Sequence, residues 1–214
     1  MVLPRAGHRT RSGVSGESMN QDVSDRLRFL RAFAANPRQV GAILPTSRWA
    51  VRDMLDLVDV PSADLVVELG AGTGVSTGEI LGRMHASARL VALEIDPRLA
   101  GLLEERYADP RLKVVCDSAE NVQRHLDGAA ADVVICALPF TSLEPATRGR
   151  ILDLMPQVLG PRGMAVVIQY SPLILPGLRR RFPAVRQRMS LRNVPPAFLF
   201  TCRRHTGRDA AGPS

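Results

Sequence analysis

Short apolar runs alternate with longer amphipathic stretches from residue 48 to residue 170. The apolar runs have strand length and end in polar or glycine residues, whereas the longer stretches repeat their apolar positions with helical spacing. Strands are predicted at 66–69, 89–96, 113–119, 131–140 and 164–170. Helices are predicted at 48–58, 75–84, 97–107, 119–125 and 144–159. This alternation predicts an α/β fold with a mostly parallel, Rossmann-like sheet and helices on both faces.

Beyond residue 170 the pattern changes, because the predicted strands are no longer separated by a long helix. A turn at 160–163 leads into the strand at 164–170, and a basic helical piece follows at 177–181. A final antiparallel pair is predicted near 185–191 and 197–204. We divide the chain into a disordered tail at 1–21, an N-terminal helical extension at 22–60, the α/β domain at 61–204 and a second tail at 205–214.

The strand at 66–69 runs into the glycine turn Gly70-Ala71-Gly72-Thr73-Gly74 and then into a helix. Glycines there permit positive φ and let a ligand approach bare backbone, toward which the helix N-terminus points its N–H groups. Glu68 precedes the turn. A carboxylate would repel the phosphates of a dinucleotide but attract a sulfonium and its amino acid tail. The turn therefore favours S-adenosylmethionine over NAD.

Polar residues at the ends of the next strands predict the rest of this cofactor site. Glu94 follows Gly72 by 22 residues, a spacing that brings its carboxylate to the ribose hydroxyls of a bound nucleoside. Asp117 ends the third strand and can accept a hydrogen bond from an adenine amino group. The residues that we assign to the cofactor site are Thr46, Ser47, Glu68, Gly70, Ala71, Gly72, Thr73, Gly74, Glu94, Ile95, Asp117, Ser118 and Ala119.

The charge of the chain indicates which kinds of partner it binds, and its cysteine content indicates the cellular compartment. The net charge is +7 with a pI near 10.5, and Lys113 is the only lysine among the basic residues. Arginine-rich surfaces bind phosphate, which indicates a nucleic acid or an anionic membrane as partner. Cys116, Cys136 and Cys202 fall in predicted buried strands with no zinc-like spacing. We expect reduced thiols, no metal site, no secretory signal and a cytoplasmic location.

The stretch Asp22–Ala35 is predicted to be a basic amphipathic helix that ends at Asn36-Pro37. Phe29 and Phe33 lie on its apolar face. Two interpretations fit this pattern equally well: the helix lies in a lipid interface, or it packs on the domain and turns its arginines to water.

S-adenosylmethionine is a methyl donor, so the next question is which group accepts the methyl. The relevant segment follows the fourth strand and reads Ala137-Leu138-Pro139-Phe140. Enzymes that methylate an amino group of a base carry Asn or Asp, then proline and an aromatic residue, at this place. Here Ala137 stands where the amide or carboxylate would hold the amine. Methylation of a nucleic-acid amino group is therefore disfavoured despite the basic charge.

Over residues 62–170 these motifs resemble the class I S-adenosylmethionine-dependent methyltransferases. Over residues 27–204 the chain looks like the bacterial phospholipid N-methyltransferases. The motifs that carry this second resemblance are Val40-Gly41-Ala42-Ile43-Leu44-Pro45-Thr46-Ser47, Leu138-Pro139-Phe140, Gln169-Tyr170-Ser171-Pro172 and Arg192-Asn193-Val194-Pro195-Pro196-Ala197. The resemblance implies methylation of phosphatidylethanolamine or its methylated derivatives by a peripheral protein, bound through its basic N-terminal helix to the inner face of the cytoplasmic membrane.

An amine with a pKa of about 10 must lose a proton before it attacks a methyl group, and an apolar, aromatic pocket favours that loss. Tyr170 and Phe140, at the ends of adjacent strands, are the candidates for this pocket wall. Candidates for holding a lipid phosphate are Arg48, Arg179, Arg180 and Arg192, and candidate bases are His125 and Asp132. An rRNA or DNA adenine N6-methyltransferase, a non-catalytic S-adenosylmethionine-binding protein and an enzyme for a small-molecule amine remain as alternatives.

Overall fold

The computed structural model describes residues 46–204. The predicted tails, the amphipathic helix at 22–35 and most of the motif at 40–47 lie outside these residues. Within residues 46–204, no helix has the length and apolar character needed to cross a bilayer.

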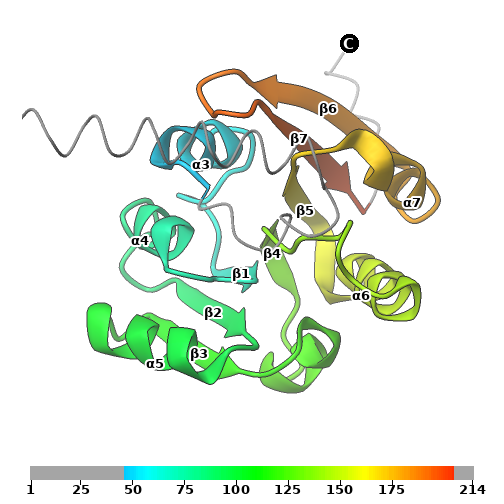
Figure 1. Ribbon diagram of the computed structural model, residues 1–214. Helices are drawn as coiled ribbons and strands as arrows, with labels where there is room; N and C mark the ends of the chain where they lie inside the picture. The colour runs from blue at the N-terminus through cyan, green and yellow to red at the C-terminus, as the bar shows by residue number, and fades with distance from the viewer. Residues whose placement is uncertain (1–45, 205–214) are drawn as a thin grey trace, which may run out of the picture.

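Seven strands form one sheet in the order β3-β2-β1-β4-β5-β7-β6 (Figure 1). The strands are β1 Leu65–Leu69, β2 Arg89–Glu94, β3 Leu112–Cys116, β4 Ala131–Cys136, β5 Leu159–Gln169, β6 Ala184–Ser190 and β7 Ala197–Arg203. The first five pair in parallel, whereas β7 lies antiparallel between β5 and β6. The predicted fold class, including the antiparallel pair at the end, is confirmed.

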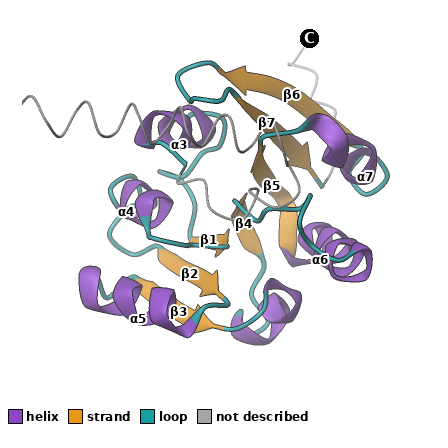
Figure 2. Cartoon of the chain, viewed as in Figure 1, coloured by secondary structure: helices purple, strands orange, loops and turns teal. Residues whose placement is uncertain are grey.

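Helices cover both faces of the sheet (Figure 2). The α-helices are α3 Arg48–Leu55, α4 Val75–Leu81, α5 Pro97–Arg106, α6 Pro145–Val158 and α7 Leu175–Arg179, and the 3₁₀ helices are η1 Ala119–His125 and η2 Pro172–Ile174. Because side chains alternate along a strand, Val66 of β1 packs toward α3 and α4, while Val67 packs in the cluster that includes η1, α6 and α7. Two apolar layers therefore enclose the sheet.

The predicted turn at 160–163 is wrong, because these residues belong to β5. A Cβ on Gly163 would come within 2.8 Å of the Ala131 carbonyl oxygen, so glycine lets β5 pass close to β4. The pairing of these two strands shifts its register between Ala131 and Val133. A glycine that looked like a turn signal thus serves a close strand approach.

The prediction that all three cysteines are buried is wrong for Cys116, which is exposed. Cys116 ends β3, and β3 is an edge strand of the sheet. Cys136 and Cys202 lie in the interior, where burial raises the pKa of each thiol to about 12. These two thiols are therefore protonated and unreactive at neutral pH.

The parallel strands bring several loops to one edge of the sheet. Leu69, Glu94 and Cys136 end their strands at this carboxyl edge. Because β7 runs in the opposite direction, its first residues pair with the end of β5, and Phe198 lies opposite Gln169. The loop 191–196 before β7 therefore also lies at the carboxyl edge.

Candidate functional site

The glycine turn after β1 has the conformation that the sequence predicts. Gly70, Gly72 and Gly74 have φ of +80°, +56° and +83°. A Cβ on Gly74 would lie 2.6 Å from Leu103, and one on Gly70 would lie 2.8 Å from Leu138. At Gly72 a Cβ would meet nothing within 4 Å in the part of the chain that the structure describes. Packing thus requires the outer glycines, whereas the space over Gly72 is open to a ligand.

The carboxylate of Glu94 fastens this turn to the end of β2. Its Oε2 accepts a hydrogen bond from the Gly72 N–H at 2.7 Å, and its Oε1 accepts one from the Asp96 N–H at 3.0 Å. Each oxygen keeps a second lone pair, which can accept from a ribose hydroxyl. The predicted position of Glu94 beside the turn agrees with the structure, and its ribose contact stays a prediction.

Glu68 is fully buried behind the turn. Its Oε2 accepts a hydrogen bond from the Thr77 hydroxyl at 2.7 Å, whereas its Oε1 has no hydrogen-bond partner among residues 46–204. Burial raises the pKa of this carboxyl, and the Ser76 and Thr77 hydroxyls oppose the shift in part. A buried carboxylate with an unpartnered oxygen fits a cationic group such as the amino acid tail of S-adenosylmethionine.

Asp117 follows β3 and lies in a network of donors. Its Oδ1 accepts from the Asn121 amide at 2.8 Å and the Ser118 N–H at 2.7 Å, and its Oδ2 lies 2.8 Å from His125 Nε2. The bonds from Asn121, His125 and Ser118, in that order of effect, lower the pKa of Asp117 to about 2. Asp117 is therefore ionised and keeps a lone pair on Oδ2 for an adenine amino group.

The remaining residues assigned to the cofactor fall in two places. Ile95 is exposed directly after Glu94, and Ala119 is buried at the start of η1. Thr46 instead contacts Tyr170 at the end of β5, and the Ser47 N–H donates to Asn193 of the loop before β7. The Ser47 hydroxyl caps α3 by accepting from the Ala50 N–H at 3.2 Å, as predicted for a cap. A cofactor role for these four residues stays a prediction.

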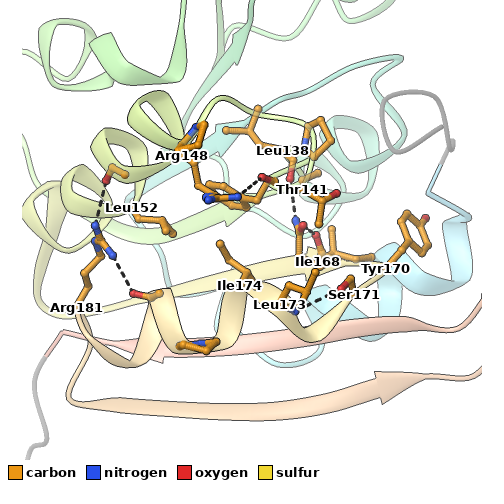
Figure 3. A pocket seen from close by; sticks show the side chains of 18 of the residues that line it. Leu138, Thr141, Arg148, Leu152, Ile168, Tyr170, Ser171, Leu173, Ile174 and Arg181 are labelled. Atoms are coloured by element: carbon orange, nitrogen blue, oxygen red, sulfur yellow. Dashed lines mark hydrogen bonds between the residues drawn. The ribbon is translucent and has the colours of Figure 1, made fainter. Parts of the chain in front are cut away.

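A cleft of about 840 Å³ lies beside the glycine turn, between the ends of β4 and β5 and the helices α6 and α7 (Figure 3). Its wall includes the apolar side chains of Leu138, Phe140 and Ile174. Three arginines line it and no aspartate or glutamate does, among the residues described. Leu138 belongs both to this wall and to the packing against Gly70, so the cleft and the glycine turn share a boundary.

Both candidates for the acceptor wall line this cleft. Phe140 is 1% exposed and packs into the interior, and Tyr170 is partly buried. Burial raises the pKa of the Tyr170 phenol, while hydrogen bonds from Thr46 and Asn193 oppose that shift. The structure thus brings Thr46, Phe140 and Tyr170 to one cleft, and contact with an acceptor amine stays a prediction.

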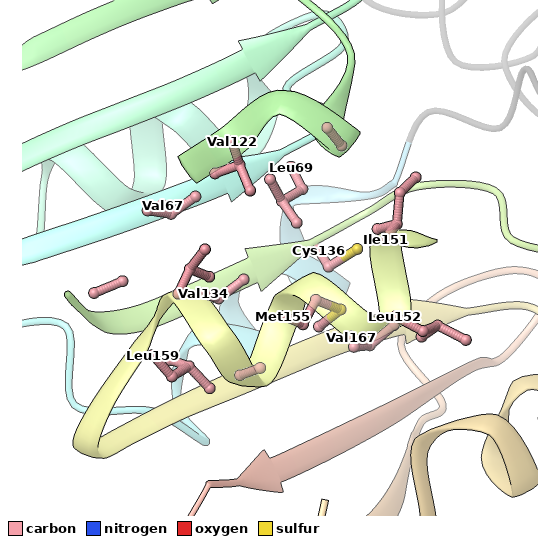
Figure 4. Close-up of a cluster of buried hydrophobic side chains, with 14 of the residues drawn as sticks. Val67, Leu69, Val122, Val134, Cys136, Ile151, Leu152, Met155, Leu159 and Val167 are labelled. Atoms are coloured by element: carbon pink, nitrogen blue, oxygen red, sulfur yellow. The ribbon is translucent and has the colours of Figure 1, made fainter. Parts of the chain in front are cut away.

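The wall formed by α6 rests on the interior of the protein (Figure 4). Ile151, Leu152 and Met155 of this helix pack in one buried cluster with Cys136 and Val167 of the sheet. Leu152 also lines the cleft. The cleft is therefore bounded on this side by a helix that packs on the sheet.

The arginines of the cleft differ from most of those proposed from the sequence. Arg180 lines it as proposed, together with Arg148 and Arg181, which the sequence analysis did not propose. Arg181 pairs with Asp153 at 2.6 Å, while Arg148 donates only a long 3.5 Å bond to the Phe140 carbonyl. Arg148 and Arg180 are therefore the cleft arginines with no acidic partner in the described region.

The other proposed arginines and bases lie elsewhere. Arg48 pairs with Glu79 and Arg192 lies 3.7 Å from Asp53, and neither they nor Arg179 line the cleft. Asp132 accepts from the Asp64 and Leu65 N–H groups at the amino end of β4, the edge away from the cleft. The proposal of Asp132 as a base is therefore wrong. His125 pairs with Asp117 and does not line the cleft.

The sequence analysis also missed Gln169 and Asn193 as individual site residues, although both stand in the motifs quoted for the family resemblance. The Gln169 amide donates to the Leu138 carbonyl at 2.7 Å and joins the ends of β5 and β4. Asn193 bonds both Ser47 and Tyr170. The available signal for Gln169 was a polar residue directly after the apolar run Val166-Val167-Ile168.

The fold, the open glycine turn and its acidic neighbours define a class I S-adenosylmethionine-dependent methyltransferase. Residues 66–163 match a family model described as a methyltransferase domain. The chain is 32% identical over 186 residues to the ornithine lipid N-methyltransferase of Singulisphaera acidiphila, covering 85% of this chain and 97% of that protein. The chain belongs to the S-adenosylmethionine-dependent methyltransferase family that includes this lipid enzyme.

Two further comparisons agree with this class. The ribosomal RNA small subunit methyltransferase A of Cutibacterium acnes is 35% identical over 113 residues, which cover 50% of this chain and 36% of that protein. The 1,6-didemethyltoxoflavin-N1-methyltransferase of Burkholderia thailandensis, solved with S-adenosylhomocysteine, has a TM-score of 0.57 at 17% identity over 91% of this chain and 92% of its own. The latter shows the shared fold. S-adenosylmethionine is the methyl donor of this protein.

Proposed function

We propose that this protein methylates the amine of a membrane lipid that carries an anionic group near that amine, with phosphatidylethanolamine and its methylated derivatives as the acceptor. It acts as a peripheral protein on the inner face of the cytoplasmic membrane. The observation that carries this proposal is the cleft beside the glycine turn, which combines an apolar, aromatic wall with arginines and, in the described region, no carboxylate. The similarity to an ornithine lipid N-methyltransferase supports a lipid acceptor.

The lining of the cleft favours the reactive form of an amine. An alkylammonium has a pKa of about 10 in water, so it must be deprotonated before it can attack. Leu138, Phe140 and Tyr170 carry no negative charge that could neutralise a buried ammonium, and no acidic residue of the described region lines the cleft. The wall therefore lowers the pKa of a bound amine, and the proton leaves to water.

The bound cofactor supplies a methyl group already activated on a sulfonium, so the protein mainly has to align the two reactants. The shared boundary at Leu138 brings the acceptor cleft next to the cofactor turn. Methyl transfer moves the positive charge from the sulfonium to the acceptor nitrogen, and the faces of Tyr170 and Phe140 can accommodate the methylammonium through cation–π contact. The monomethyl and dimethyl products lose a proton to water before the next transfer. The same wall then serves successive methylation steps.

Arg148 and Arg180 complete the match with an amphiphilic acceptor. Their guanidinium groups have no acidic partner in the region described and can bind a phosphate or carboxylate oxygen through charge-assisted hydrogen bonds. An amine that lies close to such an anion is then held between the arginines and the aromatic wall. A free hydrophobic amine without an anion would lack this second anchor.

The test supplies the protein with labelled S-adenosylmethionine and, in separate reactions, vesicles of phosphatidylethanolamine, vesicles of ornithine lipid, total RNA and duplex DNA. Label in the phosphatidylethanolamine extract supports the proposal. Label only in ornithine lipid corrects the head group and retains the lipid class. Label only in nucleic acid overturns the proposal and favours the rRNA methyltransferase relation, and no label with intact S-adenosylhomocysteine binding favours a non-catalytic role.

A variant links the reaction to the cleft. Arg148→Gln removes a cation from the lining but keeps a long polar side chain. We expect the kcat/KM for the lipid to fall about tenfold, while calorimetric affinity for S-adenosylhomocysteine is unchanged. Arg162→Gln, an exposed arginine of β5 that does not line the cleft, is the matched control and should leave both values unchanged.

A further inference from the structure

Four large exposed apolar side chains lie on segments that line the cleft or are hydrogen-bonded to a residue that lines it. Trp49, Leu173, Leu191 and Val194 are 54%, 77%, 72% and 52% exposed. They belong to three segments: the start of α3, the turn after β5 and the loop 191–196. Leu173 itself lines the cleft.

Hydrogen bonds hold these three segments together at the carboxyl edge of the sheet. Asn193 of the loop accepts from the Ser47 N–H at 3.2 Å and donates to the Tyr170 hydroxyl at 3.4 Å. Arg192 lies 5.9 Å from the ring centre of Trp49, so the loop and α3 are side by side. We call these four apolar residues the rim.

The rim has basic surroundings. Arg48, Arg52, Arg180 and Arg192 lie beside it, against the two carboxylates Glu79 and Asp53 that pair with three of them. The Arg48 and Arg192 side chains are 73% and 67% exposed despite these pairs. A local excess of positive charge around exposed tryptophan and aliphatic side chains is the composition of a surface that lies in the headgroup region of an anionic bilayer.

We propose that the rim is the surface by which this protein lies on an anionic phospholipid bilayer, with Trp49, Leu191 and Val194 entering the interface. This proposal rests on the lipid substrate proposed above. It places the mouth of the cleft against the membrane, so that an amine-bearing lipid enters without leaving the bilayer. The excess of arginine around these apolar residues favours an anionic bilayer over a protein partner.

Trp49 is the only tryptophan of the chain and therefore reports on the rim alone. The full chain is mixed with vesicles of phosphatidylglycerol and phosphatidylcholine, which contain no amine acceptor for the enzyme. We expect the Trp49 emission to shift to the blue, bromine-labelled acyl chains to quench it, and acrylamide quenching to decrease. Vesicles of phosphatidylcholine alone should bind more weakly, and salt should weaken binding to the anionic vesicles.

Variants separate the rim from other membrane contacts. We expect the double substitution Leu191→Ser and Val194→Ser to lower vesicle affinity about fivefold, since it removes apolar surface from the interface. Leu102→Ser is the matched control, because Leu102 is 57% exposed on α5, which packs on β2 and β3 at the far side of the sheet. Methylation of a short-chain lipid in dilute solution should persist in the double variant, so failure of the rim proposal is distinct from failure of the proposed function.

Two results would overturn the assignment. Sedimentation of the protein with vesicles without any change at Trp49 would place the membrane contact elsewhere in the chain. Protection of Trp49 from acrylamide before vesicles are added would show that the rim is already covered by the protein itself.

Discussion

The side-chain amide of Asn193 donates to the hydroxyl of Tyr170 at 3.4 Å and thereby ties the loop before β7 to the end of β5. Asn193 is 2% exposed, and its other contacts are the Ser47 N–H and the Pro195 carbonyl. One buried side chain therefore fixes α3, the loop and the ring of Tyr170 relative to each other. This arrangement sets the position of the aromatic wall in the acceptor cleft.

Asn193→Ala should therefore affect both stability and the acceptor site. The variant removes the hydrogen bond from the part-buried Ser47 N–H, and a typical intramolecular hydrogen bond contributes about 0.5–1.5 kcal/mol. We expect a lower melting temperature and a higher KM for the lipid, with unchanged affinity for S-adenosylhomocysteine below the melting transition. Tyr170→Phe provides the comparison, because it loses the hydroxyl contact and keeps the ring. Equal KM values for Asn193→Ala and the wild type would contradict a positioning role.

The open space over Gly72 gives a separate test of the cofactor site. A Cβ there meets no atom of the described residues within 4 Å. Gly72→Ala should therefore lose stability only through the strain of a positive φ, about 1–2 kcal/mol. The same Cβ would occupy ligand space. We expect affinity for S-adenosylhomocysteine, measured by calorimetry, to fall at least about tenfold, which corresponds to 1.4 kcal/mol.

Gly101→Ala is the control for that substitution. Gly101 lies within α5, where a Cβ also meets nothing within 4 Å but φ is not positive. Alanine should raise stability by about 0.5–1 kcal/mol and leave ligand affinity unchanged. A Gly72→Ala variant that binds the ligand as well as Gly101→Ala does would show that the cofactor does not approach the turn.

Much of this site was predictable because it depends on local sequence. The glycines, Glu94 and Asp117 follow strands whose apolar runs are evident, and parallel strands bring their ends to one edge. Arg148 was not predictable, since its place in the cleft depends on how α6 packs against the sheet. Gly163 was assigned to a turn because the sequence does not show the neighbouring Ala131 carbonyl that requires it.

Asp117→Asn should weaken the nucleoside site without removing the fold. The wild-type carboxyl has its pKa lowered to about 2, compared with 3.8 ordinarily, so its ionised form stabilises the native state above pH 3.8 and this contribution is lost as the pH falls through about 2. We expect the variant to be less stable than the wild type at pH 7 and the difference to shrink toward pH 2. Adenosine affinity should fall as well. A difference that does not depend on pH would mean that the charge of Asp117 is irrelevant to stability.

Glu68→Gln should show the opposite dependence on pH. Burial raises the pKa of Glu68 above its ordinary value of 4.5. The native state therefore favours the protonated carboxyl, and this contribution to stability is complete below pH 4.5 and lost as the pH rises through the raised value. Glutamine stays neutral throughout. We expect the variant to be more stable than the wild type at pH 8 and about equally stable at pH 4, in melting curves recorded without ligand.

Ligand binding should reverse this advantage. Oε1 of Glu68 has no hydrogen-bond partner among residues 46–204 and can accept from a cationic amino acid tail. S-adenosylhomocysteine should therefore raise the melting temperature of the wild type more than that of Glu68→Gln. Glu79→Gln is the matched control, since its pKa is lowered by Arg52 and the variant should lose stability at pH 8. An equal ligand-induced shift in Glu68→Gln and the wild type would place the amino acid tail away from this carboxylate.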